Sequence, residues 1–377
     1  MKKLFVLVLL FVLFVSATGQ KKGKRKTKMQ VNSSEVALVN PRTFIGVPVI
    51  QTKSVLNGTQ APIPAHSPPA LQSLSNSAKE YLLGPLSTRV IPIIYMLVVT
   101  VGIPANIVIL GLLATKIRKV SSAILYCSLA ISDLLLLFSL FFKAHYHLLG
   151  NHWVLGETAC RVITACFYGN LYCSAVTLAC ISVKRYLAVV YPFTYKRLPK
   201  RMLAALVSLA VWGVFFIAVI PELLVQQSFM LTELNRTSCH DVLPLNESSH
   251  ILLLYYNLVL TVLGLLLPLV ITVVCYVKII KELSKSHFDW TMYIKASSLV
   301  FGLFLVCFLP AGVLHFLHYV QLFVKGTENL YMYFNLAVCL CCLHACLDPF
   351  LYFIMSSSAG AKFYLMTFKG KTLSISI

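Results

Sequence analysis

The chain has 377 residues, of which 58% are hydrophobic and only 12% are charged, and its formal net charge is +20. Soluble domains carry about 25% charged residues, so this composition excludes an ordinary soluble protein and predicts one that crosses a membrane several times. The basic residues gather in the leader and on one side of the hydrophobic segments. This asymmetry gives no reason to expect a nucleic-acid partner.

The amino terminus has the pattern of a cleavable secretory signal. Lys2 and Lys3 precede an apolar run over residues 4–15, and small residues follow at the spacing of a signal-peptidase site. A first membrane anchor is the alternative, but this run is shorter than the roughly 20 residues that span a bilayer. We expect a signal peptide over residues 1–19 and an extracellular start of the mature chain.

The next stretch, residues 21–88, shows no sustained apolar periodicity, and its prolines interrupt any helix or central strand. We therefore expect a mostly disordered extracellular leader. Within it, Arg42 is the only Lys or Arg between Met29 and Thr52. Asn-x-Ser/Thr patterns, which are typical glycosylation sites of chains that enter the secretory lumen, occur at Asn32, Asn57, Asn235 and Asn246.

Seven hydrophobic segments follow, and each is long enough to cross a hydrocarbon core of about 30 Å as a helix. Lys and Arg cluster in alternate connectors, which predicts an extracellular amino terminus and a cytoplasmic carboxyl terminus. We expect an all-α protein of the plasma membrane in contact with lipid, with a seven-helix bundle over residues 89–355 and a short tail over residues 356–377. The segments cover residues 90–114, 123–149, 158–190, 203–225, 251–280, 292–323 and 330–355.

Only two of the 12 cysteines, Cys160 and Cys239, are expected on the oxidising side of the membrane. They can form one disulfide, which would hold the outer loop over the mouth of the bundle. The other cysteines lie in apolar helices. The run from Cys339 to Cys346 lacks Cys-x-x-Cys spacing on a loop, so we interpret it as packing rather than a zinc site. We expect neither a metal nor a cofactor.

Polar residues inside the expected helices indicate function, because burying them in hydrocarbon is costly. Asp133 and Asp348 raise the alternative of an intramembrane aspartyl protease, but neither lies in the Gly-x-Gly-Asp-like setting that such an enzyme needs. A buried ion and hydrogen-bond site that changes between two packings of the helices is the better hypothesis. Prolines mark where the helices can bend: Pro104, Pro221, Pro268, Pro310 and Pro349.

These features resemble a known family. The runs "GIPANIVIL", "LAISDLL", "CFLP" and "DPFLY" resemble the rhodopsin-like G-protein-coupled receptors over about residues 90–355. Within that family, "FYGNLYCSAVTLACISVKRYLAVVYPF" and "CLDPFLYF" resemble the proteinase-activated receptors, and the connector "HFDWTMYIKAS" most resembles a single subtype. The resemblance implies a heterotrimeric G protein as partner and a signalling core made of Asn106, Asp133, Ser174, Arg185, Tyr276, Pro310, Asp348, Pro349 and Tyr352.

The resemblance also gives Arg42 a role. In this family a trypsin-like serine protease cuts the leader after a basic residue, and the new amino terminus acts as a tethered ligand. Cleavage between Arg42 and Thr43 would divide the leader into residues 20–42 and 43–88 and expose a ligand made of Thr43, Phe44, Ile45, Gly46 and Val47. The residues expected to receive it at the outer mouth are His240, Asp241, Tyr168, His318, Tyr319, Tyr331 and Glu328.

The sequence before the scissile bond, "VNPR", resembles a site that thrombin prefers, so thrombin is favoured over other trypsin-like enzymes. No Asp or Glu lies between Val36 and Lys79, however. The acidic segment with which thrombin-cleaved relatives bind a second surface of the protease is therefore missing, and affinity would rest on the local motif.

Two departures from the family pattern concern signalling. Lys184 precedes Arg185 where most members have an acid, so we expect Tyr276 or groups of the sixth helix to hold Arg185. His344 and Ala345 replace the Asn and Ser of the family. This replacement argues against sodium at Asp133 with Ser174, and it would allow His344 to bond Asp348.

Three functions remain open. The first is a protease-triggered receptor, and the second is a receptor for a diffusible peptide in which Arg42 is incidental. The third is a cofactor or decoy that is cut and presents the protease to a partner receptor of the same family. An enzyme or a transporter is disfavoured, because no nucleophile-base pair and no inverted repeat is visible in the sequence.

Overall fold

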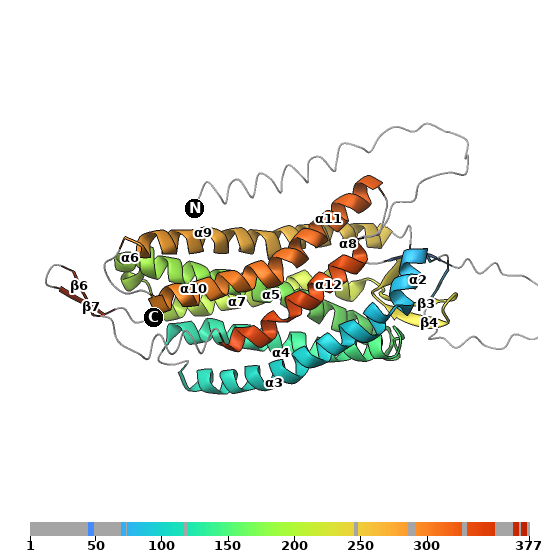
Figure 1. Ribbon diagram of the computed structural model, residues 1–377, viewed down its shortest axis with the longest axis horizontal. Helices are drawn as coiled ribbons and strands as arrows, with labels where there is room; N and C mark the ends of the chain where they lie inside the picture. Colours follow the sequence, from blue (N-terminus) through green and yellow to red (C-terminus); the bar gives the residue numbers. More distant parts are fainter. Residues whose placement is uncertain are drawn as a thin grey trace, which may run out of the picture. The chain divides into compact units, whose positions relative to one another are not determined.

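The computed structural model describes residues 44–48, 69–72, 74–116, 120–244, 248–285, 291–325, 330–350, 365–368 and 371–374. Seven helical spans within these residues are long and apolar enough to cross a membrane, as the sequence predicted (Figure 1). The last of them, Tyr331–Phe350, includes the helix that runs from His344 to Phe350. Their elements are α3 (Ile91–Lys116), α4 (Ser121–Leu148), α5 (Gly156–Val190), α7 (Lys200–Leu224), α8 (Ser248–Thr261) with α9 (Leu267–Leu283), α10 (Thr291–Leu303) with α11 (Leu309–Lys325), and α12 (Tyr331–Cys342).

The bundle is organised around α5, which packs against α4, α7 and α9. α3 packs along α4 and also contacts α12. The outward faces carry large apolar side chains, such as Leu209 and Ile217 of α7, which are 69% and 67% exposed. Such exposure is unfavourable in water but favourable in lipid, because the hydrocarbon core accepts apolar side chains. Lipid also requires that backbone groups form their hydrogen bonds within the protein, as they do in these helices.

Three π-helical turns occur among the described residues, and each ends two residues before a proline. They are η2 (Leu86–Val90) before Pro92, η3 (Val262–Leu266) before Pro268 and η4 (Phe304–Phe308) before Pro310. Proline lacks an N–H and its ring clashes with the carbonyl four residues earlier, and a wider turn relieves both problems. Pro104 and Pro221 lie inside α3 and α7 without such a turn.

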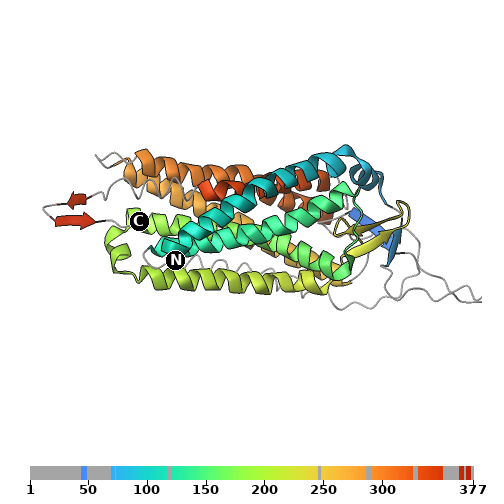
Figure 2. The same ribbon diagram turned by 90° about the horizontal axis from the view of Figure 1, so that it is seen from below.

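A five-stranded sheet has the order β4-β3-β2-β1-β5 and combines the leader with the loop between α7 and α8. Figure 2 shows the blue strand of the leader beside the yellow strands of that loop. β1 runs parallel to β5 and places Phe44 opposite Val242, while β2 runs antiparallel to β1 and parallel to β3. The strands are β1 (Phe44–Pro48), β2 (Ala70–Gln72), β3 (Ser228–Leu231), β4 (Arg236–Cys239) and β5 (Val242–Pro244).

A short helix, α2 (Asn76–Leu83), precedes η2 and α3. The Ser75 side chain caps it by accepting a hydrogen bond from the Ala78 N–H at 3.1 Å. Its buried face consists of Ala78, Tyr81 and Leu82. The sequence predicts a mostly disordered leader over residues 21–88, and within it the structure describes the strands β1 and β2 and the helix α2.

The tail expected over residues 356–377 contains two described strands, β6 (Leu365–Phe368) and β7 (Lys371–Ser374), which pair antiparallel. Several predictions fall outside the described residues. These are the signal peptide over residues 1–19, the cleavage pair Arg42 and Thr43, the glycosylation sites Asn32, Asn57 and Asn246, and the residues Glu328 and Tyr352.

Candidate functional site

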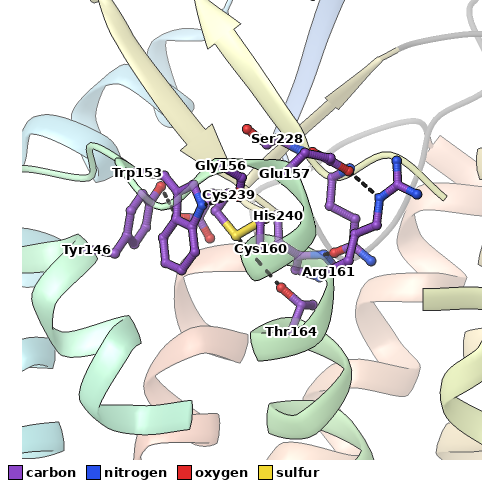
Figure 3. The surroundings of a disulfide bond; sticks show 12 residues. Tyr146, Trp153, Gly156, Glu157, Cys160, Arg161, Thr164, Ser228, Cys239 and His240 are labelled. Carbon is purple, nitrogen blue, oxygen red and sulfur yellow. Dashed lines mark hydrogen bonds and ion pairs between the residues drawn. A yellow bond between two sulfur atoms is a disulfide. The ribbon is translucent and has the colours of Figure 1, made fainter. Parts of the chain in front are cut away.

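The disulfide between Cys160 and Cys239 forms as the sequence predicted, with the Cα atoms 5.7 Å apart (Figure 3). It joins the first turns of α5 to the end of β4. Tyr146 and Trp153 pack into the same buried cluster as the two cysteines. The residues that follow Cys239 are therefore fixed at the outer end of the bundle.

Glu157 forms a second anchor between α5 and the outer loop. Its carboxylate accepts hydrogen bonds from the backbone N–H groups of Gln227 at 2.9 Å and Ser228 at 2.7 Å (Figure 3). It also pairs with Arg161 of the same helix at 2.5 Å. This role of Glu157 could not be predicted from the sequence, because nothing in the local pattern shows which backbone groups a carboxylate will meet.

Asp241 is only 4% exposed, and tyrosines from two different helices satisfy its carboxylate. The Tyr146 hydroxyl of α4 donates to Oδ2 at 2.8 Å, and the Tyr331 hydroxyl of α12 donates to Oδ1 at 2.9 Å. Such bonds offset the cost of burying a charge, which is otherwise several kcal/mol. Asp241 thus ties the outer loop to two helices that are far apart in the sequence.

Phe44 of the leader occupies a buried position beside Asp241. Its backbone N–H donates to the Asp241 carbonyl oxygen at 2.7 Å, and its ring is 2% exposed. The ring centroid lies 4.7 Å from that of Tyr331 and 5.5 Å from that of Tyr81, the α2 residue that sequence reasoning missed. Aromatic pairs of this kind contribute about 0.5–1.5 kcal/mol each beyond the area that they bury.

The other residues expected at the mouth have different neighbours. His240 is buried with a φ of 70°, and its Nδ1 lies 2.7 Å from the Gln227 side-chain oxygen. Its ring centroid lies 5.2 Å from that of Tyr168. Lys143, another residue that the sequence analysis did not single out, places Nζ 5.8 Å from the same Tyr168 ring. Tyr168 thus lies beside both His240 and Lys143.

Two further residues that were expected at the outer mouth come from α11. His318 is fully buried, with its ring centroid 6.1 Å from that of Tyr331. Tyr319 lies in α11, but its side chain is outside the described residues. Among the described glycosylation patterns, Asn235 is exposed in the turn between β3 and β4 with a φ of 51°, a conformation that Asn tolerates well.

The polar residues of the bundle core interact across helices. The Asn106 side-chain amide donates to the Ala345 carbonyl at 2.7 Å and to the Gly102 carbonyl at 3.0 Å. The Ser174 hydroxyl donates to Asp133 at 3.3 Å. The expected bond from His344 to Asp348 is wrong: His344 Nε2 instead faces Asp133 at 3.5 Å, because its ring is directed toward α4.

The expectation for Arg185 is also wrong. Its Nη2 donates to the Tyr126 hydroxyl of α4 at 2.9 Å, because α4 packs directly along α5. Tyr276, the expected partner, bonds Ser298 at 3.0 Å and stacks on Phe301 with centroids 4.3 Å apart.

The chain is similar to known membrane receptors over most of its length. A family model described as "7 transmembrane receptor (rhodopsin family)" matches residues 105–352. Proteinase-activated receptor 3 of Homo sapiens is 43% identical over 285 residues, which cover 76% of each chain. Proteinase-activated receptor 3 of Rattus norvegicus is 38% identical over 358 residues, which cover 94% of this chain and 97% of the relative.

A relative of another subtype, proteinase-activated receptor 2 of Mus musculus, is 34% identical over 307 residues, which cover 79% of this chain and 76% of the relative. Receptor 3 is the subtype that the connector "HFDWTMYIKAS" resembles. The similarity extends over most of the chain in each case, so the resemblance that the motifs carried is confirmed.

Proposed function

Because the chain belongs to the rhodopsin family of seven-transmembrane receptors, and within it to the proteinase-activated receptors, we propose that a protease activates it by cutting between Arg42 and Thr43. The protein is a multi-pass receptor of the plasma membrane and not an enzyme. Its partners are an activating protease and a heterotrimeric G protein. The tethered ligand in this proposal is the segment from Thr43 to Val47.

The position of Phe44 carries the proposal. Phe44 is the second residue of the proposed ligand, and its ring is buried against Tyr81 and Tyr331 while its N–H donates to Asp241. The register of β1 along β5 adds main-chain pairing at Ile45 and Gly46. Strand addition of this kind supplies affinity through the backbone and specificity through side-chain pockets, which is how short peptides are recognised.

Cleavage would change the group that precedes Phe44. In the intact chain the nitrogen of Thr43 belongs to the amide that joins it to Arg42. After cleavage the same nitrogen is a free ammonium group, one residue before Phe44, and consecutive Cα atoms lie about 3.8 Å apart. The contacts of Phe44 exist in the intact chain, so they alone cannot shift the receptor between two states. We therefore assign the trigger to the new ammonium, which would lie close to the buried carboxylate of Asp241.

Thrombin is the protease that we propose. The support is "VNPR", which ends at Arg42, a basic residue suited to an acidic specificity pocket. The stretch between Val36 and Lys79 contains no acidic residue, so the local motif would supply the whole interaction. We accordingly expect trypsin, which needs only the basic residue, to cut at the same bond.

Cells that express the receptor with an epitope tag ahead of Arg42 test the proposal. Thrombin or trypsin is added while tag release and cytosolic calcium are recorded for the wild type, for Arg42→Ala and for the control Lys53→Ala, which removes the next basic residue. Wild type and Lys53→Ala are expected to release the tag and to respond. Arg42→Ala is expected to keep the tag and to stay silent.

Each outcome separates the alternatives. Equal calcium responses from wild type and Arg42→Ala would contradict cleavage at this bond. Release of the tag without calcium would indicate the cofactor or decoy function. Phe44→Ala, which removes the buried ring, is expected to release the tag and to lose the calcium response; a full response would remove Phe44 from the proposed ligand.

A further inference from the structure

β1, the strand that contains most of the proposed ligand, lies between two other strands of the sheet. The strand order places β2 on one side of it and β5 on the other. β5 belongs to the outer loop and runs parallel to β1, whereas β2 belongs to the leader and runs antiparallel to β1. The proposed ligand therefore has two neighbours, and a later segment of the leader is one of them.

β2 is attached to the outer loop by bonds that do not involve β1. The Pro69 carbonyl accepts a hydrogen bond from the Met230 N–H at 2.9 Å. The Leu71 carbonyl accepts from the N–H and from the hydroxyl of Thr232, both at 3.0 Å. The Leu71 side chain is also fully buried. β2 is therefore part of the outer end of the receptor and offers an edge on which another strand can pair.

The helix that follows β2 is attached at two further points. Lys79 of α2 forms an ion pair at 2.7 Å with Glu233, in the turn between β3 and β4. The Leu82 carbonyl accepts a hydrogen bond at 2.7 Å from the side-chain amide of Asn151, in the connector between α4 and α5. Residues 69–82 are thus tied to two loops of the receptor, and a cut upstream of β1 would leave these contacts in place.

The direction of the backbone groups shows which edge of β2 faces β1. Successive residues of a strand direct their N–H and C=O groups to opposite edges. Because the Leu71 carbonyl bonds to β3, the backbone groups of Gln72 face β1, where Val47 is the partner in the register. The Phe44 N–H bonds to the Asp241 carbonyl and so faces the other edge, toward β5. By the same alternation, the groups of Val47 face β2.

Pro48 marks the end of the paired strand. The pairing of β1 with β5 ends at Gly46, and the alternation directs the backbone of Pro48 to the β5 side, beyond the last pair. Proline has no N–H, and a sheet tolerates it where no partner needs that donor. On the other side of β1, Pro48 lies opposite Leu71 of β2. The strand that pairs with the receptor thus runs from Phe44 to Pro48, one residue beyond Val47.

We propose that the tethered ligand is held in a two-edged slot, in which β5 pairs with one edge of the ligand strand and β2 with the other. The ligand then comprises six residues, Thr43 to Pro48, and leader residues 70–72 are part of the site that receives it. The slot fits one extended peptide strand, and Tyr81 and Tyr331 form the pocket for the aromatic second residue. This inference rests on the proposed function, which takes the residues from Thr43 onward as the ligand.

Two substitutions at one position separate the backbone of β2 from its side chain. Gln72→Pro removes the N–H that faces β1 and keeps the bond that the Leu71 carbonyl accepts from β3, whereas Gln72→Ala removes only an exposed side chain. Before cleavage, Gln72→Pro is expected to accelerate hydrogen exchange at residues 44–47 of the purified full-length receptor by about 2- to 10-fold, the effect of losing one hydrogen bond. Gln72→Ala is expected to leave the exchange unchanged. Equal exchange in the two variants would overturn the proposal.

A cross-link tests the slot without the proline variant. Val47→Cys with Gln72→Cys joins opposite residues, whose Cα atoms lie about 5.5 Å apart in a hydrogen-bonded antiparallel pair, within the range for a disulfide. Val47→Cys with Ala70→Cys, two residues away along β2, is the control. A site-specific protease site inserted after Gln60 releases an amino-terminal tag unless the disulfide has formed. The first pair is expected to keep the tag on a non-reducing gel and the control to lose it; loss of the tag in both would overturn the proposal.

The calcium response distinguishes failure of the slot from failure of the proposed function. The strand stays in the slot after cleavage, so the receptor cross-linked between positions 47 and 72, without the inserted site, is expected to respond to protease as the wild type does. A cross-linked receptor that is cut after Arg42 but stays silent, beside a responding wild type, would overturn the slot. Equal responses from Arg42→Ala and the wild type would contradict the proposed function instead, since exchange and cross-linking are measured on the uncleaved chain.

Discussion

Arg185 at the inner end of α5 has a partner that replaces the missing acid. The neighbouring Lys184 cannot pair with it, and Lys184 instead donates to Ser121 and Ser122 at 3.0 and 2.7 Å. The Tyr126 hydroxyl accepts from Arg185 at 2.9 Å, so among the described side chains it is α4 that holds this cation. A neutral hydroxyl can release the guanidinium without separating two charges.

Substitution of Tyr126 tests this contact. Tyr126→Phe keeps the ring and removes the acceptor, and a buried hydrogen bond to a charged group contributes about 1.5–3 kcal/mol. We expect roughly 10-fold or more redistribution toward the signalling state, measured as inositol phosphate accumulation without protease. Tyr333→Phe, which alters an exposed tyrosine of α12, is the control. Unchanged basal signalling in Tyr126→Phe would show that this bond does not restrain Arg185.

α2 shows how a short element positions one residue of the mouth. The helix is only eight residues long, and helices of this length are marginal without caps and packing. Ser75 supplies the cap, and Tyr81 packs its ring against Phe44 and Tyr331. The order of α2 and the burial of Phe44 therefore depend on each other.

The Ser75 cap of α2 can be removed by a substitution that leaves Tyr81, Phe44 and Tyr331 in the sequence. Ser75→Ala should destabilise the helix by about 0.5–2 kcal/mol, because the Ala78 N–H loses its acceptor. We expect hydrogen exchange at residues 78–82 to accelerate by about 2- to 30-fold, measured by mass spectrometry of the intact receptor. Ser77→Ala, at an exposed position inside the same helix, should leave the exchange unchanged. Equal exchange in the two variants would mean that packing alone holds α2.

At the outer end of the molecule, one disulfide and several polar contacts together hold the loop between α7 and α8 in place. The disulfide fixes Cys239 to α5, Glu157 holds the start of β3, and Asp241 connects to α4 and α12. The leader strand β1 adds to β5, which directly follows these anchors. The loop therefore has a defined edge on which a segment of the leader can pair.

Removal of the disulfide tests this arrangement. The bond links residues 79 positions apart in the sequence, for which chain entropy gives a contribution of about 4.5 kcal/mol. The double variant Cys160→Ala with Cys239→Ala should lower the unfolding temperature of the purified receptor and weaken its response to protease. Cys180→Ala, a free cysteine of α5, should change neither. An unchanged response in the double variant would show that Glu157 and Asp241 suffice to hold the loop.

The membrane topology, the disulfide and the family could be predicted from the sequence, because they follow from local hydrophobicity, from the compartment of each cysteine and from motifs. It also placed Asp241 and Tyr331 at the outer end of the bundle, since both lie in or next to segments that the topology places outside. The π turns before Pro92, Pro268 and Pro310 could be predicted from the sequence only in part. Pro104 and Pro221 lie in helices without such a turn, so a proline alone does not specify one.

Which side chains meet across the helices could not be predicted from the sequence and depends on the packing of the folded chain. Tyr81, Tyr146 and Tyr331 come from three helices, and no sequence spacing relates them to Phe44 or Asp241. The partner of Arg185 and the approach of His344 to Asp133 likewise depend on how α4 packs against its neighbours. Helix formation is local and can be inferred from periodicity, whereas contacts between helices depend on the relative rotation and depth of each span, which packing sets.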